Sequence, residues 1–215
     1  LVDKPVGPTS HDIVDAARRA LGVRKIGHAG TLDPFASGLL ILAVGAMTKS
    51  ISRFVGLDKA YEAALRLGAT SDTMDRTGAV TDRPETAPVS SKDFEAALEK
   101  FRGEIDQTPP MYSAKKVGGK KLYELARAGK EIERKPVRVK IYELETVSYA
   151  WPIAKIRTRV SSGTYIRALA DDIGKALGCG AYLEELRRTA VGPYRVEEAV
   201  PPERIAPERL FVPRV

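Results

Sequence analysis

The sequence predicts one main domain of the α/β class, in its α+β form, with a mixed and largely antiparallel central sheet flanked by helices. Two observations lead to this prediction. Amphipathic helical segments and strand-like segments mix along the chain without strict βαβ alternation. The chain has 215 residues, 43% of them apolar, which suffices for one substantial core, or for one core with a large insertion.

The N-terminal part predicts a helix, a loop and two strands, in that order. Residues 9–21 place their apolar side chains on one face, and Thr9 and Asp12 have the spacing of a capping box. Residues 27–38 are rich in Gly, Thr, Ser, Asp and Pro and predict a loop. The apolar run 39–44 is short enough for one buried strand, and the alternation over 61–67 predicts a half-buried strand.

The C-terminal part predicts further helices and strands around an irregular excursion. Residues 104–136 contain a Pro pair and a Gly pair, with a possible short helix around 123–128, and they do not have the pattern of a core segment. The other predicted elements are a helix at 91–102, strands at 137–149 and 153–160, a turn and cap at 161–164, a helix at 165–177 and a last strand near 183–191.

The net charge of +7 is concentrated in one stretch. Residues 115–140 contain ten Lys and Arg and three Glu, so this stretch accounts for the whole excess of positive charge. Such a concentration indicates contact with a polyanion, although a lysine-rich solvated loop would have the same composition.

Several classes of function are excluded by what the sequence lacks. Cys179 has no second cysteine for a disulfide, and two histidines leave almost no ligands for a zinc site. The string at 45–50 (GAMTKS) lacks the glycines of a phosphate-binding loop, and there is no G-x-S-x-G motif. There is also no 18-residue apolar run and no leader-like start, so we expect a soluble, cytoplasmic protein.

What remains is an acidic residue in a loop. Asp33 precedes Pro34, and an Asp-Pro pair usually forms a turn whose carboxylate caps backbone amides. His28 could simply bond to a neighbouring loop, and Tyr61 or Tyr165 could be ordinary core aromatics. Considered singly, these residues do not define a site.

Six segments together resemble the bacterial tRNA pseudouridine-55 synthase family, the TruB-type pseudouridine synthases. Their order and spacing match that family across nearly the whole chain. The segments are KPVGPTS (4–10), GHAGTLDPFASGLL (27–40), KAYEAALRLGATSDTMDRTG (59–78), TPPMYSAKKVGGKKLYELARAG (108–129), SSGTYIRALADDIG (161–174) and LRRTAVG (186–192).

The resemblance implies a role for each matching residue. Asp33 matches the catalytic aspartate. Residues that match the substrate-binding positions are His28 beside the extruded nucleotide, Tyr61 stacked on the base, Tyr165 lining the pocket, Arg167 paired with the catalytic carboxylate, and Leu186 beneath the uracil. Lys4 and Pro5 match a motif that braces the active-site loop. The expected RNA contacts are Lys4, Lys115, Lys116, Lys120, Lys121, Arg127 and Lys130, most of them on a thumb that closes over the RNA.

The implied reaction converts uridine to pseudouridine at position 55, in the T-loop of tRNA. The bond from ribose C1′ to uracil N1 breaks and C1′ joins C5, without net oxidation or reduction, so no cofactor and no metal are expected. A carboxylate can act as the transient partner in such a rearrangement. Attack at C1′, attack at C6 and proton loss from C2′ all use the same residues.

The resemblance also implies a domain plan. Residues 1–195 are expected to form the pseudouridine synthase catalytic domain, with the thumb inserted at about 106–136. Residues 196–215 are expected to be a tail, with the usual C-terminal RNA-binding (PUA) domain absent. We expect a monomer that needs no guide RNA. Two alternatives stay open, a catalytically silent RNA chaperone on the same fold and a guide-RNA-dependent catalytic subunit.

Overall fold

A computed structural model describes residues 1–113, 116–117, 119–127, 129–130 and 132–211, with the backbone alone for residues 116, 117, 120, 121, 123, 124 and 127. The chain forms two compact units. The first contains residues 1–59 and 187–215, and the second contains residues 60–186.

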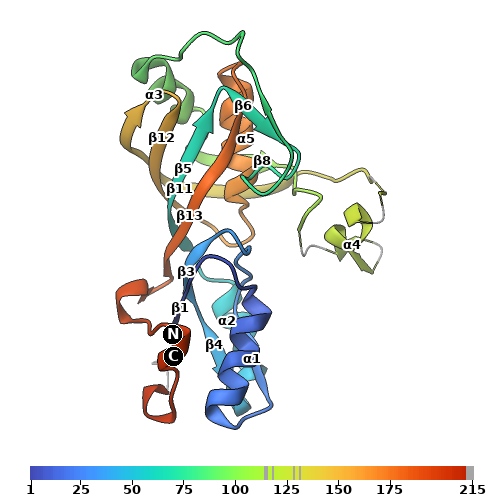
Figure 1. Ribbon diagram of the computed structural model, residues 1–215, viewed down its shortest axis with the longest axis vertical. Helices are drawn as coiled ribbons and strands as arrows, with labels where there is room; N and C mark the ends of the chain where they lie inside the picture. Colours follow the sequence, from blue (N-terminus) through green and yellow to red (C-terminus); the bar gives the residue numbers. More distant parts are fainter. Residues whose placement is uncertain (114–115, 118, 128, 131, 212–215) are drawn as a thin grey trace. The chain divides into compact units, whose positions relative to one another are not determined.

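The first unit combines short strands with two helices. Its strand order is β1-β3-β13, in which β1 and β3 are antiparallel and β3 and β13 are parallel, and β2 pairs with β4 in an antiparallel ribbon. Its elements are β1 (Val2–Lys4), α1 (Ser10–Leu21), β2 (Ile26–His28), β3 (Ser37–Leu40), β4 (Leu42–Val44), the 3₁₀ turn η1 (Gly45–Ser50), α2 (Ile51–Val55), the end of β13 (Ala181–Val191), β14 (Tyr194–Arg195) and the 3₁₀ turns η2 (Val196–Glu198), η3 (Pro202–Arg204) and η4 (Pro207–Arg209) (Figure 1).

The first helix forms as the sequence predicts. The Thr9 side chain accepts a hydrogen bond from the Asp12 amide, and the Asp12 carboxylate accepts one from the Thr9 amide, which completes the capping box. Gly22 ends the helix in the left-handed conformation. The buried face of α1 contains Ile13 and Val14, and this face packs against the ribbon of β2 and β4.

The apolar run 39–44 is not the single strand that we predicted. It divides at Ile41 into β3, which pairs with β1 and β13, and β4, which pairs with β2. The Ile41 carbonyl accepts a hydrogen bond from the Ala29 amide, 2.9 Å away. The prediction was wrong because an apolar run reports burial, whereas the change of strand partner at Ile41 depends on residues distant in sequence.

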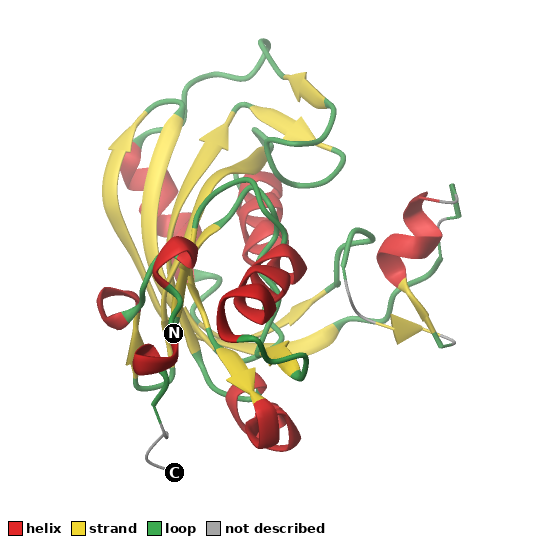
Figure 2. Ribbon diagram, turned by 60° about the horizontal axis from the view of Figure 1, so that its bottom comes forward, coloured by secondary structure: helices red, strands yellow, loops and turns green. Residues whose placement is uncertain are grey.

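The second unit contains more strand than helix (Figure 2). Its strand order is β13-β5-β12-β11-β8, with separate antiparallel pairs β6/β7 and β9/β10. The α3 helix packs against β11 and α5. The elements are β5 (Lys59–Leu67), β6 (Ala69–Ser71), β7 (Val80–Asp82), α3 (Ser91–Glu99), β8 (Gly103–Gln107), β9 (Lys116–Val117), β10 (Lys120–Lys121), α4 (Leu122–Arg127), β11 (Val137–Ala150), β12 (Ile153–Val160) and α5 (Ile166–Ala176).

Most predicted elements of this unit are confirmed, with three differences. The α3 helix ends at Glu99, three residues before the predicted end. The start of the excursion is a strand, because β8 pairs along the antiparallel β11. No side chain caps α5 at its N-terminus. In the part of the chain that the structure describes, no helix is both long and apolar enough to cross a membrane.

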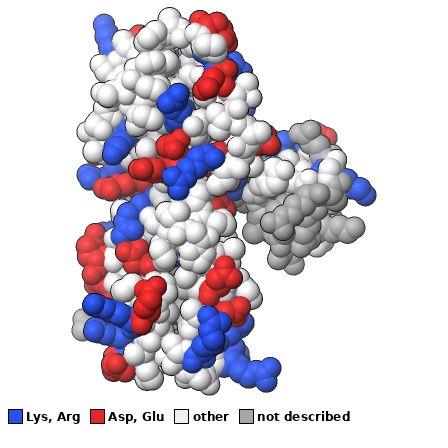
Figure 3. Space-filling model, viewed as in Figure 1, with Lys and Arg blue, Asp and Glu red and all other residues white. Residues whose placement is uncertain are grey.

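On the face drawn in Figure 3, the coloured acidic and basic side chains alternate over short distances. Ion pairs such as Arg157 with Glu62 (3.0 Å) and Arg159 with Glu143 (2.8 Å) have both partners exposed, and such pairs contribute little stability.

Candidate functional site

Asp33 lies in a loop that the first unit holds at several points. The Ala36 amide donates to the Asp33 carbonyl (3.1 Å), which closes a turn with Pro34 at its second position. The Gly7 amide donates to the Pro34 carbonyl (2.8 Å). Ser10, buried at the start of α1, donates its hydroxyl to the Leu32 carbonyl (3.0 Å) and accepts from the Leu32 amide (2.9 Å). The loop is therefore fixed before any substrate binds.

Three buried cations surround this loop in the first unit. Arg188 on β13 donates to main-chain carbonyls of the loop and of β3. The Lys4 ammonium donates to the carbonyls of Pro5 (2.8 Å) and Pro8 (2.9 Å). Lys59 donates to the carbonyls of Val55 (2.5 Å) and Leu57 (2.6 Å), at the end of α2. Buried cations are costly, so their concentration around one loop indicates a functional site.

The electrostatics of these groups centre on the same loop. Burial lowers the pKa of Lys4 to about 8; the Asp33 carboxylate opposes this shift, and the Arg188 guanidinium adds to it. Burial also lowers the pKa of Lys59 to about 8, again with a contribution from Arg188. The pKa of His28 is lowered by burial and then by Arg188, so the imidazole is neutral at pH 7.

In the second unit, Arg167 is a buried guanidinium near the start of α5. It donates to the carbonyls of Thr73 (2.9 Å) and Tyr112 (2.7 Å) and lies 3.4 Å from the carboxylate of Asp75. Asp75 is buried as well and accepts hydrogen bonds from the hydroxyls of Thr73 (2.9 Å) and Thr77 (2.5 Å). The guanidinium orientation is thus fixed by three groups on two loops.

Gln107 at the end of β8 holds Tyr165. The Gln107 side chain, 1% exposed, donates to the Tyr165 carbonyl (3.1 Å) and accepts from the Tyr165 amide (2.8 Å). This pair of bonds fixes the main chain of Tyr165, directly before the first residue of α5. Tyr61 on β5 and Leu186 on β13 are both buried, at 7% and 9% exposure.

Sequence reasoning missed Asp75 and Gln107 in the second unit, and Lys59 and Arg188 in the first. Asp75 lies in a Ser-, Thr- and Asp-rich stretch that reads as an ordinary loop, and its pairing with Arg167 spans more than ninety residues. Gln107 sits before a Pro pair, with no local pattern that marks it. The signal for Asp75 was its place inside the segment 59–78, which carries part of the family resemblance.

The predicted site residues divide between the units. Asp33 and His28 belong to the first unit, and the second contains Tyr61, Tyr165, Arg167 and Leu186.

The residues predicted to contact RNA differ in their surroundings. The Lys4 side chain is fully buried and bonded to backbone carbonyls, which does not suit a direct phosphate contact and suits the bracing role. Lys130 is exposed, Lys115 lies outside the described residues, and of Lys116, Lys120, Lys121 and Arg127 the backbone is described.

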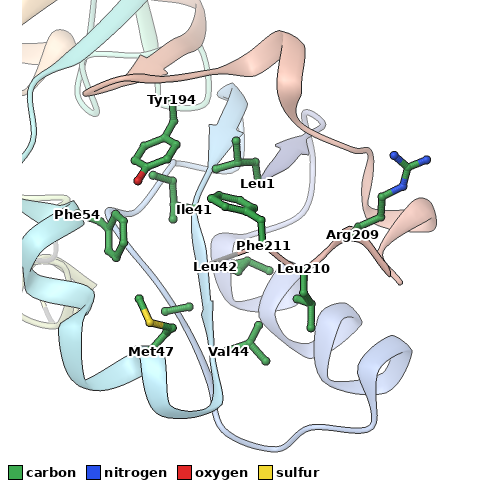
Figure 4. Close-up of a pocket in the computed structure, with 11 residues that line it drawn as sticks. Leu1, Ile41, Leu42, Val44, Met47, Phe54, Tyr194, Arg209, Leu210 and Phe211 are labelled. Atoms are coloured by element: carbon green, nitrogen blue, oxygen red, sulfur yellow. The ribbon is translucent and has the colours of Figure 1, made fainter. Parts of the chain in front are cut away.

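A separate apolar pocket of about 180 Å³ lies within the first unit (Figure 4). Ile41, Phe54 and Tyr194 line it together with Leu210 and Phe211 of the tail. In Figure 4 the guanidinium of Arg209, the one charged side chain among the lining residues, points away from these side chains. A lining without an acid or base at its centre does not suit catalysis, so the loop of Asp33 is the stronger candidate.

Solved structures share this fold. The chain is similar to one in a crystal structure of a Cbf5-Nop10-Gar1 complex, with a TM-score of 0.73 and 32% identity, over 93% of this chain and 50% of that one. It is also similar to a chain in a structure of an H/ACA RNP bound to a substrate RNA containing 2′-deoxyuridine, with a TM-score of 0.70 and 29% identity, over 93% and 49% of the two chains.

Curated relatives are more similar still. The chain is 53% identical over 201 residues to tRNA pseudouridine synthase B of Azoarcus sp. (strain BH72), covering 93% of this chain and 66% of the relative. It is 50% identical to the Bordetella avium protein of the same name, over 93% and 83%, and 47% identical to that of Thermotoga maritima, over 96% and 67%. The chain thus spans about two thirds of the length of the first of these relatives.

The mixed sheet is that of the pseudouridylate synthases. Within that class, residues 18–166 match the profile described as TruB family pseudouridylate synthase (N terminal domain), and residues 167–210 match that of the tRNA pseudouridylate synthase B C-terminal domain. The chain belongs to the TruB family.

Proposed function

We propose that this chain isomerises a uridine of tRNA to pseudouridine, and that its target is position 55 in the T-loop. The observation that carries the proposal is the 53% identity over 201 residues to a tRNA pseudouridine synthase B. The braced loop of Asp33 supports it, because this reaction needs a carboxylate held in one position.

The proposed reaction conserves all atoms of the nucleotide. The bond from C1′ to N1 breaks and a bond from C1′ to C5 forms, while the hydrogen on C5 leaves as a proton and N1 gains one. A uridine stacked in RNA hides these atoms, so the enzyme flips the nucleotide outward at a cost of about a few kcal/mol. Stacking on Tyr61 offsets roughly 1 to 3 kcal/mol of that cost.

Within this proposal, Asp33 is the catalytic residue and works as the ionised carboxylate. His28 lies beside the flipped nucleotide as a neutral imidazole, in line with its lowered pKa. Tyr165 lines the pocket, Leu186 lies under the uracil, and Arg167 pairs with Asp33. The hydrogen bonds of Arg167 to Thr73 and Tyr112 would orient it for that pairing.

We further propose that the protein acts as a monomer without guide RNA, and that the thumb contacts the RNA backbone. Substitution of Lys115, Lys116, Lys120 and Lys121 by Gln is expected to reduce the slope of log affinity against log salt concentration by roughly 3, because each phosphate contact releases about 0.7 to 0.9 counterions. Equilibrium binding of a T stem-loop RNA at several salt concentrations measures this slope.

The matched control replaces four lysines away from the thumb, Lys92, Lys100, Lys155 and Lys175, all of them exposed. It removes the same total charge and should leave the slope close to that of the unmodified protein. Equal slopes for the two quadruple variants would show that the thumb lysines make no specific phosphate contacts.

The target position is tested on one unmodified tRNA transcript, incubated with the protein alone and mapped for pseudouridine at every uridine. Modification at position 55 is expected, and a transcript with cytidine at that position should stay unmodified. Modification of other uridines to the same extent as position 55, or a requirement for added guide RNA, would contradict the proposal.

A further inference from the structure

We propose that Arg188 is a positioning residue for catalysis, which clamps the two ends of the Asp33 loop through its guanidinium and supplies the positive charge beside the carboxylate. This inference rests on the proposed function of Asp33. It concerns a residue on β13 that does not touch the substrate in our proposal and that acts through the loop.

The clamp is defined by three hydrogen bonds. Arg188 is 1% exposed, and its Nε donates to the Leu39 carbonyl at 2.7 Å, after the loop. Its two terminal nitrogens donate to the carbonyls of Gly30 (3.1 Å) and Thr31 (3.4 Å), before Asp33. One rigid planar group therefore fixes the main chain on both sides of the catalytic carboxylate.

The acceptors of these bonds carry no net negative charge. Among the residues that the structure describes, the hydrogen bonds of the Arg188 side chain go to neutral main-chain carbonyls, and the nearby buried Lys4 and Lys59 are cations as well. Burying several like charges close together is costly for the stability of the fold. The positive charge of Arg188 lies against the main chain of the Asp33 loop.

Glycine 30 shows how closely this charge approaches the loop. A Cβ built on Gly30, whose φ is +90°, would lie 3.6 Å from a guanidinium nitrogen of Arg188 and 3.9 Å from the Lys59 side chain. The positive φ is what favours glycine here, and both cations lie within ordinary contact distance of this residue.

Arg188 influences the titratable groups that face the loop from several elements. Its charge lowers the pKa of Lys4 on β1, Lys59 on β5 and His28 on β2, whereas Asp33 raises that of Lys4. On α1, Asp12 raises the pKa of Lys4 and His11 lowers that of His28. Asp58, next to β5, raises the pKa of Lys59. A fixed positive charge at this place favours the ionised carboxylate of Asp33 and the neutral imidazole of His28.

Two substitutions separate the effect of the hydrogen bonds of Arg188 from the effect of its positive charge. Arg188→Lys keeps the positive charge but replaces the planar fork by a single ammonium, whereas Arg188→Gln removes the charge. Arg19→Gln is the matched control, because it removes one positive charge from an exposed position on α1. Folding of each variant is checked by thermal unfolding and circular dichroism.

The first readout is the NMR titration of the histidine Cε1 protons. The chain has two histidines, so each curve can be assigned, and the exposed His11 serves as an internal reference. The midpoint of His28 is expected to rise in Arg188→Gln, because the neighbouring positive charge is removed. It should not move in Arg188→Lys or Arg19→Gln.

The second readout is tritium release from a T stem-loop RNA labelled at C5 of uridine, measured as kcat and KM against pH. Arg188→Lys is expected to lower kcat by about 10-fold or more with little change in KM, because the loop is displaced while RNA binding is intact. In Arg188→Gln the acidic limb of the profile should also move to higher pH.

Each outcome bears on the proposal. A folded Arg188→Gln variant with unmoved His28 titration and an unmoved acidic limb overturns the electrostatic role, and wild-type kcat in Arg188→Lys overturns the clamp. If Arg188→Gln does not fold, the kcat of Arg188→Lys alone decides. An Asp33→Asn variant distinguishes the two levels. If it retains activity, the proposed role of Asp33 fails, and the role of Arg188 that rests on it fails as well. An inactive Asp33→Asn beside an unaltered Arg188→Lys refutes only the clamp by Arg188.

Discussion

Replacing Asp33 by Asn is expected to abolish pseudouridine formation, with a fall in kcat of roughly 10⁴-fold or more, because removal of a group that reacts directly with the substrate has effects of this size. Binding of the T stem-loop RNA is expected to persist within about threefold, since the amide preserves the size of the side chain. Single-turnover tritium release and a filter-binding titration on the same preparation measure the two quantities.

The control for this variant is Asp72→Asn, which exchanges a carboxylate for an amide in a loop of the second unit; in the structure the Asp72 side chain accepts from the Ala79 amide. It should keep most of the activity. Substantial turnover by Asp33→Asn would remove Asp33 from the centre of the proposed mechanism, and loss of RNA binding would indicate that the loop had collapsed.

Arg167→Met is expected to lower kcat by about 100-fold, the usual effect of removing one positioned donor from an active site. In the proposed site Arg167 pairs with Asp33, and a nearby positive charge favours an ionised carboxylate. The acidic limb of the pH–rate profile should therefore move to higher pH. The substitution also leaves Asp75 buried without a cation, so the thermal midpoint should fall.

The double variant Arg167→Met with Asp75→Asn separates these two effects. It removes both charges of the buried pair, so much of the stability is expected to return while kcat stays low. Recovery of kcat together with stability would mean that Arg167 serves the fold of its loops and not the reaction. Arg157→Met is the matched control, because Arg157 pairs with Glu62 at an exposed site.

Local structure was the most predictable part of this protein. The helix at 10–21 follows from the spacing of Thr9 and Asp12 and from one apolar face, all within thirteen residues. The paired strands β11 and β12 follow from their alternation and from the short turn between them. In each case the determining residues are neighbours in sequence, so the local pattern is enough to predict the element.

The candidate site could be predicted only in part. By its local sequence alone, Asp33 is an ordinary turn residue. Only the family resemblance predicts that it is the catalytic residue. The groups that hold the site could not be found in this way. Arg188 bonds to Gly30 across more than 150 residues, and Gln107 reaches Tyr165 across 58, so no local pattern reports either contact. The division of the run 39–44 into two strands has the same long-range cause.

The main-chain contact between β3 and β13 has a consequence for how the chain finds its strand alignment. A Cβ at Gly38 would lie 2.7 Å from the amide nitrogen of Arg188 and would overlap its carbonyl group, so only glycine fits opposite that residue. The parallel pairing of β3 with β13 covers only two residues, so the pattern of apolar side chains specifies its register weakly. A shift of the register by one residue would place Ser37 or Leu39 opposite Arg188. Steric exclusion therefore rejects the misaligned sheet during folding, whichever side chain stands at position 188.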